Sequence, residues 1–128
     1  MKLAEKEDIR REYRSFFYML PGKETVGEFV KVLEFISPDS VEIWTELNLL
    51  ELSLENGTLT FEDMMSVMEE EDQAVLQELK VNQVYACDYE ASDRKMVQKI
   101  VKCLTDSFGG FYASDTEDFK PFLKLEEL

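Results

Sequence analysis

The dipeptide Asn56-Gly57 lies between two runs that alternate apolar and polar residues, LELSLE before it and TLTFED after it. Asn and Gly tolerate the positive backbone dihedrals of a two-residue turn, so this pattern predicts a β-hairpin. The middle of the chain is therefore expected to form antiparallel sheet. The expected register places apolar residues on one face and acids on the other, with the cross-strand pairs Leu54–Leu59, Leu52–Phe61 and Glu51–Glu62.

Three further segments are expected to be strands. The run from Val41 to Leu47 alternates with period two, and its phase changes at Leu49-Leu50, which predicts a bulge or a break into two strands. A helix over Val41–Leu50 is the alternative that the pattern leaves open. Gln83–Glu90 has apolar residues on both faces and is expected at the centre of the sheet, and Phe111–Ser114 forms a shorter strand.

Four segments are expected to be helices. Ile9, Tyr13, Phe16, Phe17 and Leu20 recur at helical spacing before Pro21-Gly22, and Thr25 with Glu28 forms a capping box for a second helix. A third helix covers Met65–Leu79, and a fourth begins at Ser92 or Asp93 and ends at Gly109-Gly110.

These elements define an α+β fold class. We expect an N-terminal α-hairpin followed by a mainly antiparallel sheet of about three to five strands with helices packed on one face, and a ferredoxin-like arrangement is one form this could take. The 128 residues are the size of one domain, so residues 1–128 are expected to form a single compact unit. No apolar run reaches the ~20 residues of a membrane span. The N-terminal residues also lack the apolar core of a signal peptide, and a cytoplasmic location is expected.

The chain contains no histidine, which removes the commonest general base and the commonest zinc ligand. Its two cysteines, Cys87 and Cys103, have apolar neighbours that favour a structural role. The sequence therefore favours a non-enzymatic protein without a cofactor, although it leaves the question of catalysis open.

The net charge of −14 is concentrated in the middle of the chain. No Lys or Arg occurs between Lys31 and Lys80, and nucleic acid and anionic membranes are disfavoured as partners because both require basic surfaces. A basic protein partner is favoured instead, while the oligomeric state stays open. Thirteen acids fall within this span: Glu34, Asp39, Glu42, Glu46, Glu51, Glu55, Glu62, Asp63, Glu69, Glu70, Glu71, Asp72 and Glu78.

Trp44 is the candidate anchor for such a partner. If Val41 and Ile43 face the core, Trp44 lies on the same side as Glu42 and Glu46. Tryptophan is enriched at the energetic centres of interfaces, and surrounding acids would steer a basic partner toward it. The alternative is that a helix covers this face. The predicted partner-binding residues are Glu42, Trp44, Glu46, Glu51 and Glu62.

Two other sites are considered. A small-ligand or catalytic pocket could form where Tyr85, Cys87, Tyr89 and Tyr112 meet Asp88 or Asp115. The acids Asp115, Glu117 and Asp118 could join Asp88 around Mg²⁺ or Ca²⁺, but their spacing fits no calcium loop, and no metal site is predicted.

In charge and size the chain resembles immunity proteins, which neutralise basic toxin domains. The resemblance covers no motif and transfers no residue. It implies inhibitor-like binding of a basic protein, which agrees with the distribution of charge.

Overall fold

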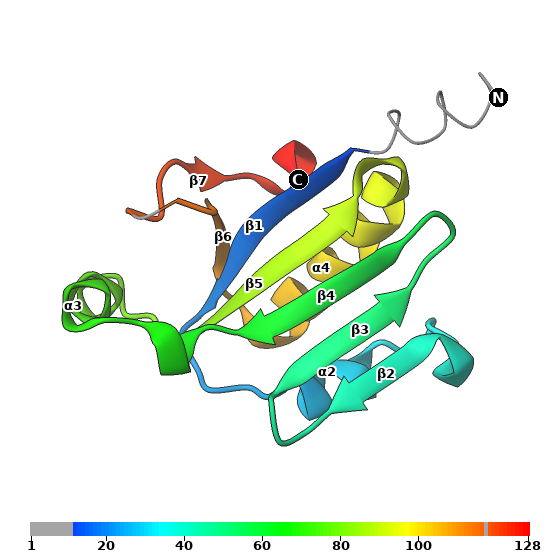
Figure 1. Cartoon of the computed structure of the whole chain (residues 1–128), viewed down its shortest axis with the longest axis horizontal. Helices are drawn as coiled ribbons and strands as arrows, with labels where there is room; N and C mark the ends of the chain where they lie inside the picture. The colour runs from blue at the N-terminus through cyan, green and yellow to red at the C-terminus, as the bar shows by residue number, and fades with distance from the viewer. Residues whose placement is uncertain (1–11, 117) are drawn as a thin grey trace, which may run out of the picture.

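The computed structural model describes residues 12–116 and 118–128. These residues form one seven-stranded antiparallel sheet and three α-helices (Figure 1). The strands lie side by side in the order β2-β3-β4-β5-β1-β6-β7. In chain order they are β1 (Tyr13–Leu20), β2 (Val41–Trp44), β3 (Leu49–Ser53), β4 (Thr58–Asp63), β5 (Gln83–Glu90), β6 (Phe111–Ser114) and β7 (Phe122–Leu123).

Two helices, α2 (Val26–Val32) and α4 (Arg94–Phe108), pack on one face of the sheet and lie behind it in Figure 1. The predicted capping box of Thr25 and Glu28 is present at the start of α2. Gly109 ends α4 with a φ of 77°, a conformation that glycine adopts without steric cost. The buried residues that α4 contributes to this core are Val97, Ile100, Val101 and Leu104.

The third helix, α3 (Glu70–Glu78), packs at the opposite face of the sheet. Its Leu76 lies in a second core with Phe17 and Met19 of β1 and Val84 of β5. This second core involves the β5, β1 and β6 side of the sheet. The same face of β2, β3 and β4 contributes no residue to either apolar core of the described chain.

The predicted first helix is wrong, because residues 13–20 form β1. Both faces of this strand are buried. Phe16 and Tyr18 lie in the core beneath α2 and α4, which we call the helix-side core, and Phe17 and Met19 lie in the second core. A continuous apolar run of this kind satisfies helical spacing and strand burial equally, so periodicity cannot distinguish the two. Ile9 lies outside the described residues. The predicted N-terminal α-hairpin is therefore a strand followed by a single helix.

The segment Val41–Leu50 is not a helix. It breaks into β2 and β3 around a turn at residues 45–48, the second of the two outcomes expected from the phase change. The hairpin between β3 and β4 has a different register from the prediction, pairing Leu52 with Leu59 and Leu50 with Phe61. Glu51 lies opposite Thr60, so the predicted Glu51–Glu62 pair does not form.

The register differs because the turn is wider than two residues. Asp93 accepts hydrogen bonds from the backbone N–H of Asn56 at 3.0 Å and from its side-chain amide at 2.9 Å. The backbone N–H of Leu54 bonds to the carbonyl of Gly57 at 2.7 Å. Asp93 therefore anchors the hairpin tip, and its side chain does not cap α4 as the sequence suggested.

The α+β class is confirmed, but the sheet has seven strands rather than three to five. The element order β1-α2-β2-β3-β4-α3-β5-α4-β6-β7 also differs from the β-α-β-β-α-β order of ferredoxin-like folds. The strand Gln83–Glu90 has its predicted bounds and lies between β4 and β1. Among the described residues, none of the helices has the length and apolar character that crossing a bilayer requires.

Candidate functional site: an acidic sheet face

Strand pairing brings residues from β2, β3 and β4 onto one surface. Glu42 lies directly opposite Glu51, and Trp44 lies directly opposite Leu49. On the next strand, Thr60 pairs with Glu51, and Glu62 pairs with Leu49. Paired residues of an antiparallel sheet point to the same side, so this surface is opposite to α2 and α4. We call it the open face: Glu42, Trp44, Leu49, Glu51, Thr60 and Glu62.

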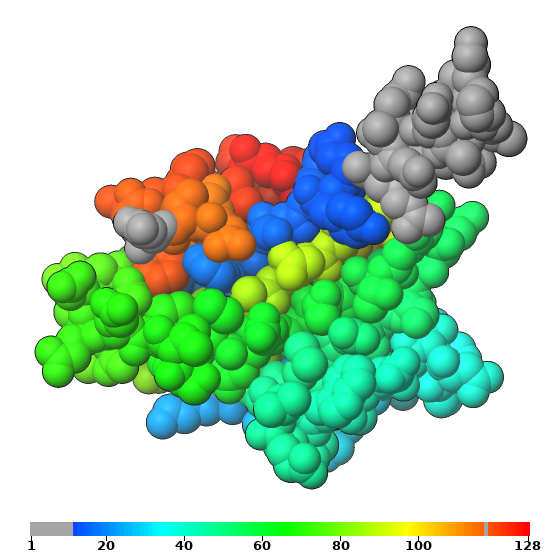
Figure 2. All heavy atoms as spheres, viewed as in Figure 1, coloured from blue at the N-terminus to red at the C-terminus, as the bar shows by residue number. Residues whose placement is uncertain are grey.

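Within residues 12–116 and 118–128, the elements that cover this side of the sheet lie over the other strands, so the open face is accessible. Figure 2 shows this side, with β2 to β4 in cyan and green and α3 at the left. Glu42 and Glu62 are exposed, and Trp44 keeps 39% of its surface exposed. The other possibility for Trp44, that a helix covers it, does not hold for the described residues.

The structure brings together four of the five predicted partner-binding residues: Glu42, Trp44, Glu51 and Glu62. Glu46 is exposed in the turn between β2 and β3 rather than on a strand, so it belongs to the edge of the surface. The new feature is the direct pairing of Glu42 with Glu51, which the sequence register did not place together.

The negative charge of the open face has no basic counterpart among the described residues. The two salt bridges in residues 12–116 and 118–128, Arg14–Glu12 and Lys102–Asp106, lie elsewhere. The strand residues that point to this side include no Lys or Arg. Asp88 of β5 extends the acidic row beyond Thr60, and it accepts a hydrogen bond from Ser15 at 2.6 Å.

Asn48 fixes the turn that connects Trp44 to Leu49, and sequence reasoning did not identify it. Its φ is 50°, a left-handed conformation that Asn tolerates better than most residues. Its side-chain carbonyl accepts the backbone N–H of Val26 at 2.9 Å, and its amide donates to Asp63 at 2.9 Å and to the Tyr85 hydroxyl at 2.8 Å. The turn is thereby tied to the start of α2, to the end of β4 and to β5. An Asn at a phase change between two alternating runs is the signal that could have pointed to it.

The proposed pocket around Tyr85, Cys87, Tyr89 and Tyr112 is filled. All four side chains belong to the helix-side core, with exposures of 0%, 0%, 1% and 7%. Burial raises the pKa of the Cys87 thiol well above its usual value and raises the pKa of Tyr85 in the same direction. Asp88 lies on the opposite face of β5 from these residues, since it pairs with Thr60. The ligand-pocket hypothesis therefore gains no support from this geometry.

The acids considered for a metal ion do not assemble in the described part of the chain, where no group of three potential ligands is found. Asp118 accepts the backbone N–H of Lys120 at 3.2 Å and the Thr116 hydroxyl at 3.0 Å, which is the bonding of a tight turn. Asp115 is exposed. Glu117 lies outside the described residues.

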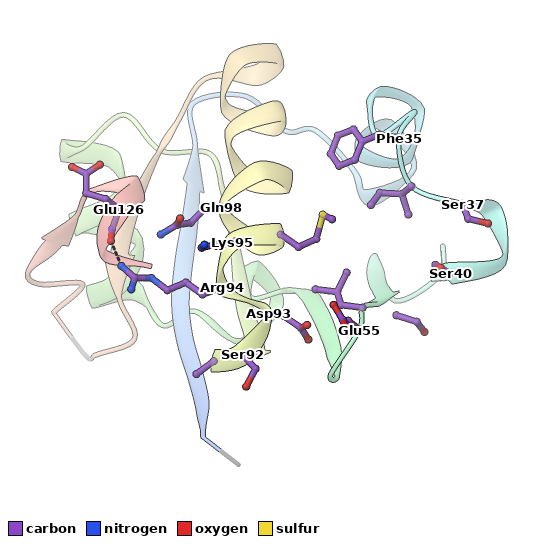
Figure 3. A pocket seen from close by; sticks show the side chains of 15 residues that line it. Phe35, Ser37, Ser40, Glu55, Ser92, Asp93, Arg94, Lys95, Gln98 and Glu126 are labelled. Carbon is purple, nitrogen blue, oxygen red and sulfur yellow. Dashed lines mark hydrogen bonds between the residues drawn. The ribbon is translucent and has the colours of Figure 1, made fainter. Parts of the chain in front are cut away.

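A cleft of about 1040 Å³ lies at the N-terminal end of α4 (Figure 3). Two of its charged residues hold the fold. Asp93 binds Asn56, and Arg94 donates to the Leu128 carbonyl at 2.7 Å and to the Glu126 carbonyl. Glu55, Lys95 and Glu126 also line the cleft, which therefore mixes both signs of charge.

A second cleft, of about 840 Å³, lies beside α3 on the same side of the sheet as the open face. We call it the α3 cleft. It is bordered by α3 and the 3₁₀ turn before it (Met65–Val67), and by Asp115, Thr116, Asp118 and Phe119 between β6 and β7. Phe17 links it to the open face, because the cross-strand row Leu49–Glu62–Ala86–Phe17 runs from one surface to the other.

Comparisons with protein-family models, with curated proteins and with solved structures give no match for this chain.

Proposed function

We propose that this chain is a non-enzymatic interaction protein that binds a basic protein partner through its open face, in the manner of an immunity protein or inhibitor. The observation that carries the proposal is geometric. Three separate strands place Glu42, Glu51 and Glu62 around Trp44 on one uncovered face, without a Lys or Arg on the same strand surface.

The Glu42–Glu51 pair supports this role. Like charges directly opposite each other on neighbouring strands destabilise a sheet. A Lys or Arg of a partner lying between the two carboxylates would replace repulsion by two attractive contacts. The pair thus lowers the stability of the free protein, and a bound cation would turn this repulsion into favourable binding energy.

Trp44 supplies the apolar component. Its half-exposed ring pairs with Leu49, so an apolar strip lies next to the two glutamates. Interfaces concentrate their binding energy in such aromatic anchors, while surrounding charges accelerate association and select the partner. Together the ring and the acids define a surface that fits a basic protein better than a nucleic acid or a metal ion.

The test begins with recovery of partners from an extract of the native host on immobilised protein, followed by isothermal titration calorimetry with the purified partner. We expect Glu42→Lys, Glu51→Lys and Glu46→Lys to weaken binding, with the largest loss at the paired glutamates. We also expect the wild-type affinity to fall as the ionic strength rises.

The matched control is Glu34→Lys, which makes the same charge change at an exposed site just after α2, the helix on the opposite face of the sheet. If the open-face variants bind as tightly as this control and show the wild-type salt dependence, the open face is not the binding site.

A further inference from the structure

The α3 cleft has an apolar interior. Phe17 and Phe119 are almost fully buried at its base, with their ring centroids 5.5 Å apart. Val67 on the wall keeps 64% of its surface exposed, and Val75 keeps 38%. The apolar residues that line the cleft are Phe17, Met64, Val67, Met68, Val75 and Phe119.

The rim of the cleft is acidic. Five of its lining residues are Asp or Glu, and none is Lys or Arg: Glu69, Glu71, Asp72, Asp115 and Asp118. Glu69 and Asp72 form the capping box of α3, and Asp118 holds its own turn, so these three have structural roles.

The other two acids have no such role. Within the described residues, neither Glu71 nor Asp115 makes a side-chain hydrogen bond or an ion pair. Their charges stand on opposite walls of the cleft, one on α3 and the other after β6.

We propose that the α3 cleft binds a basic amphipathic helix of another protein, with its apolar side chains on the Met and Phe interior and its Lys or Arg side chains at the acidic rim. Methionine side chains are flexible and polarizable, and they adapt to helical ligands of varied sequence. The walls of the cleft are a helix and a connecting segment, so they provide no strand edge for an extended peptide to pair with. A second copy of this chain is a poor occupant because it carries a net charge of −14.

The proposal does not depend on the open face, although both surfaces lie on one side of the sheet. A cationic helix could occupy the cleft even if the open face bound nothing. The two proposals can therefore fail separately.

The test uses the full chain with ¹³C-labelled methionine methyl groups, titrated with a synthetic amphipathic helical peptide of Leu and Lys and observed by NMR. Met64 and Met68 line the cleft, whereas Met96 lines the cleft at α4 and serves as an internal control. We expect saturable shifts of the Met64 and Met68 methyl signals and none at Met96. Equal shifts at all three, or no saturable shift, would overturn the proposal.

Substitutions at the rim and wall separate charge from apolar contact. The double variant Glu71→Lys with Asp115→Lys is expected to weaken peptide binding about tenfold or more, because it reverses the two uncommitted charges. Val67→Ser, at an exposed wall position, is expected to weaken binding without changing the charge. Glu78→Lys reverses a single charge on α3 outside the cleft lining and should bind like the wild type.

Two outcomes would count against the cleft. Unchanged affinity in the double variant would show that the rim does not select cations. Concentration-dependent shifts of Met64 and Met68 in the absence of peptide would show that a second copy is the occupant. Glu42→Lys should leave peptide binding unchanged, so a loss of partner binding in that variant reports on the open face alone.

Discussion

Asn48 links three parts of the molecule through one side chain. It bonds to Val26 at the start of α2, to Asp63 at the end of β4 and to Tyr85 in β5, and the Tyr85 hydroxyl in turn donates to the Glu24 carbonyl at 2.6 Å. Each buried polar group must find a partner or incur a desolvation cost. The position of Trp44 therefore depends on a polar network beneath the open face.

Asn48→Ala is expected to lower the free energy of unfolding by roughly 2–4 kcal/mol, because it removes three hydrogen bonds and leaves buried partners unsatisfied. Asn48→Gly removes the same bonds but tolerates the positive φ, so it should be less destabilising by about 1 kcal/mol. Urea unfolding of both variants measures the difference. If Ala and Gly are equivalent and close to wild type, the network does not hold the turn.

The buried tyrosines make a prediction about alkaline pH. Burial raises the pKa of Tyr18 and Tyr85 above the ordinary value, which is about 10 in an unfolded chain. The contribution of these groups to stability is therefore complete below about pH 10 and is lost as the pH rises above it, since the unfolded chain ionises first.

We expect tyrosinate absorbance from these residues to appear together with the loss of circular dichroism, in one cooperative alkaline transition. Gradual ionisation of all tyrosines near pH 10 with an unchanged dichroism spectrum would contradict the burial of their hydroxyls.

At the scale of elements, the pairing of β2 with β3 carries an internal cost. Glu51→Lys would place a cation directly opposite Glu42 and is expected to raise the free energy of unfolding by roughly 0.2–1 kcal/mol. The same substitution is expected to weaken binding of the basic partner, so a loss of affinity would accompany a gain in stability. Thermal unfolding by calorimetry measures the change, and Glu62→Lys, which lies opposite Leu49, is the matched control. A destabilised Glu51→Lys variant would show that the two carboxylates do not repel each other.

The elements that could be predicted from sequence are those with a local signal. The capping box located the start of α2, the two glycines located the end of α4, and Gln83–Glu90 was predicted with its observed bounds. The helix predicted over residues 13–20 is wrong, because a strand buried on both faces has an apolar pattern that also satisfies helical spacing.

The predicted register of the hairpin between β3 and β4 is wrong for a different reason. The contact that sets it joins Asn56 to Asp93, residues far apart in the sequence, and no local rule anticipates such a bond. For the candidate site, the alternation of apolar and polar residues is enough to predict that Glu42 and Trp44 lie on one side of a strand. The pairing of Glu42 with Glu51 and the α3 cleft required tertiary structure, because both depend on which strands become neighbours.

At the scale of the whole molecule, the sheet separates two different surfaces. One face is buried under α2 and α4, which lie behind the sheet in Figure 1. The other face carries the open face and the α3 cleft. The acids around Trp44 and those around the α3 cleft lie on one side of the sheet. A basic protein that approaches this side would be steered toward both surfaces at once.

Trp44 is the single tryptophan of the chain, so its fluorescence reports directly on the open face. The most direct test is a titration of the protein with its purified basic partner, or a tryptophan-free variant of that partner, while the emission of Trp44 is recorded at low and at physiological ionic strength. We expect a saturable change in emission that weakens as salt is added and that is lost in the Glu42→Lys, Glu51→Lys double variant. Tight binding with unchanged Trp44 emission, or an unchanged affinity in the double variant, would contradict it.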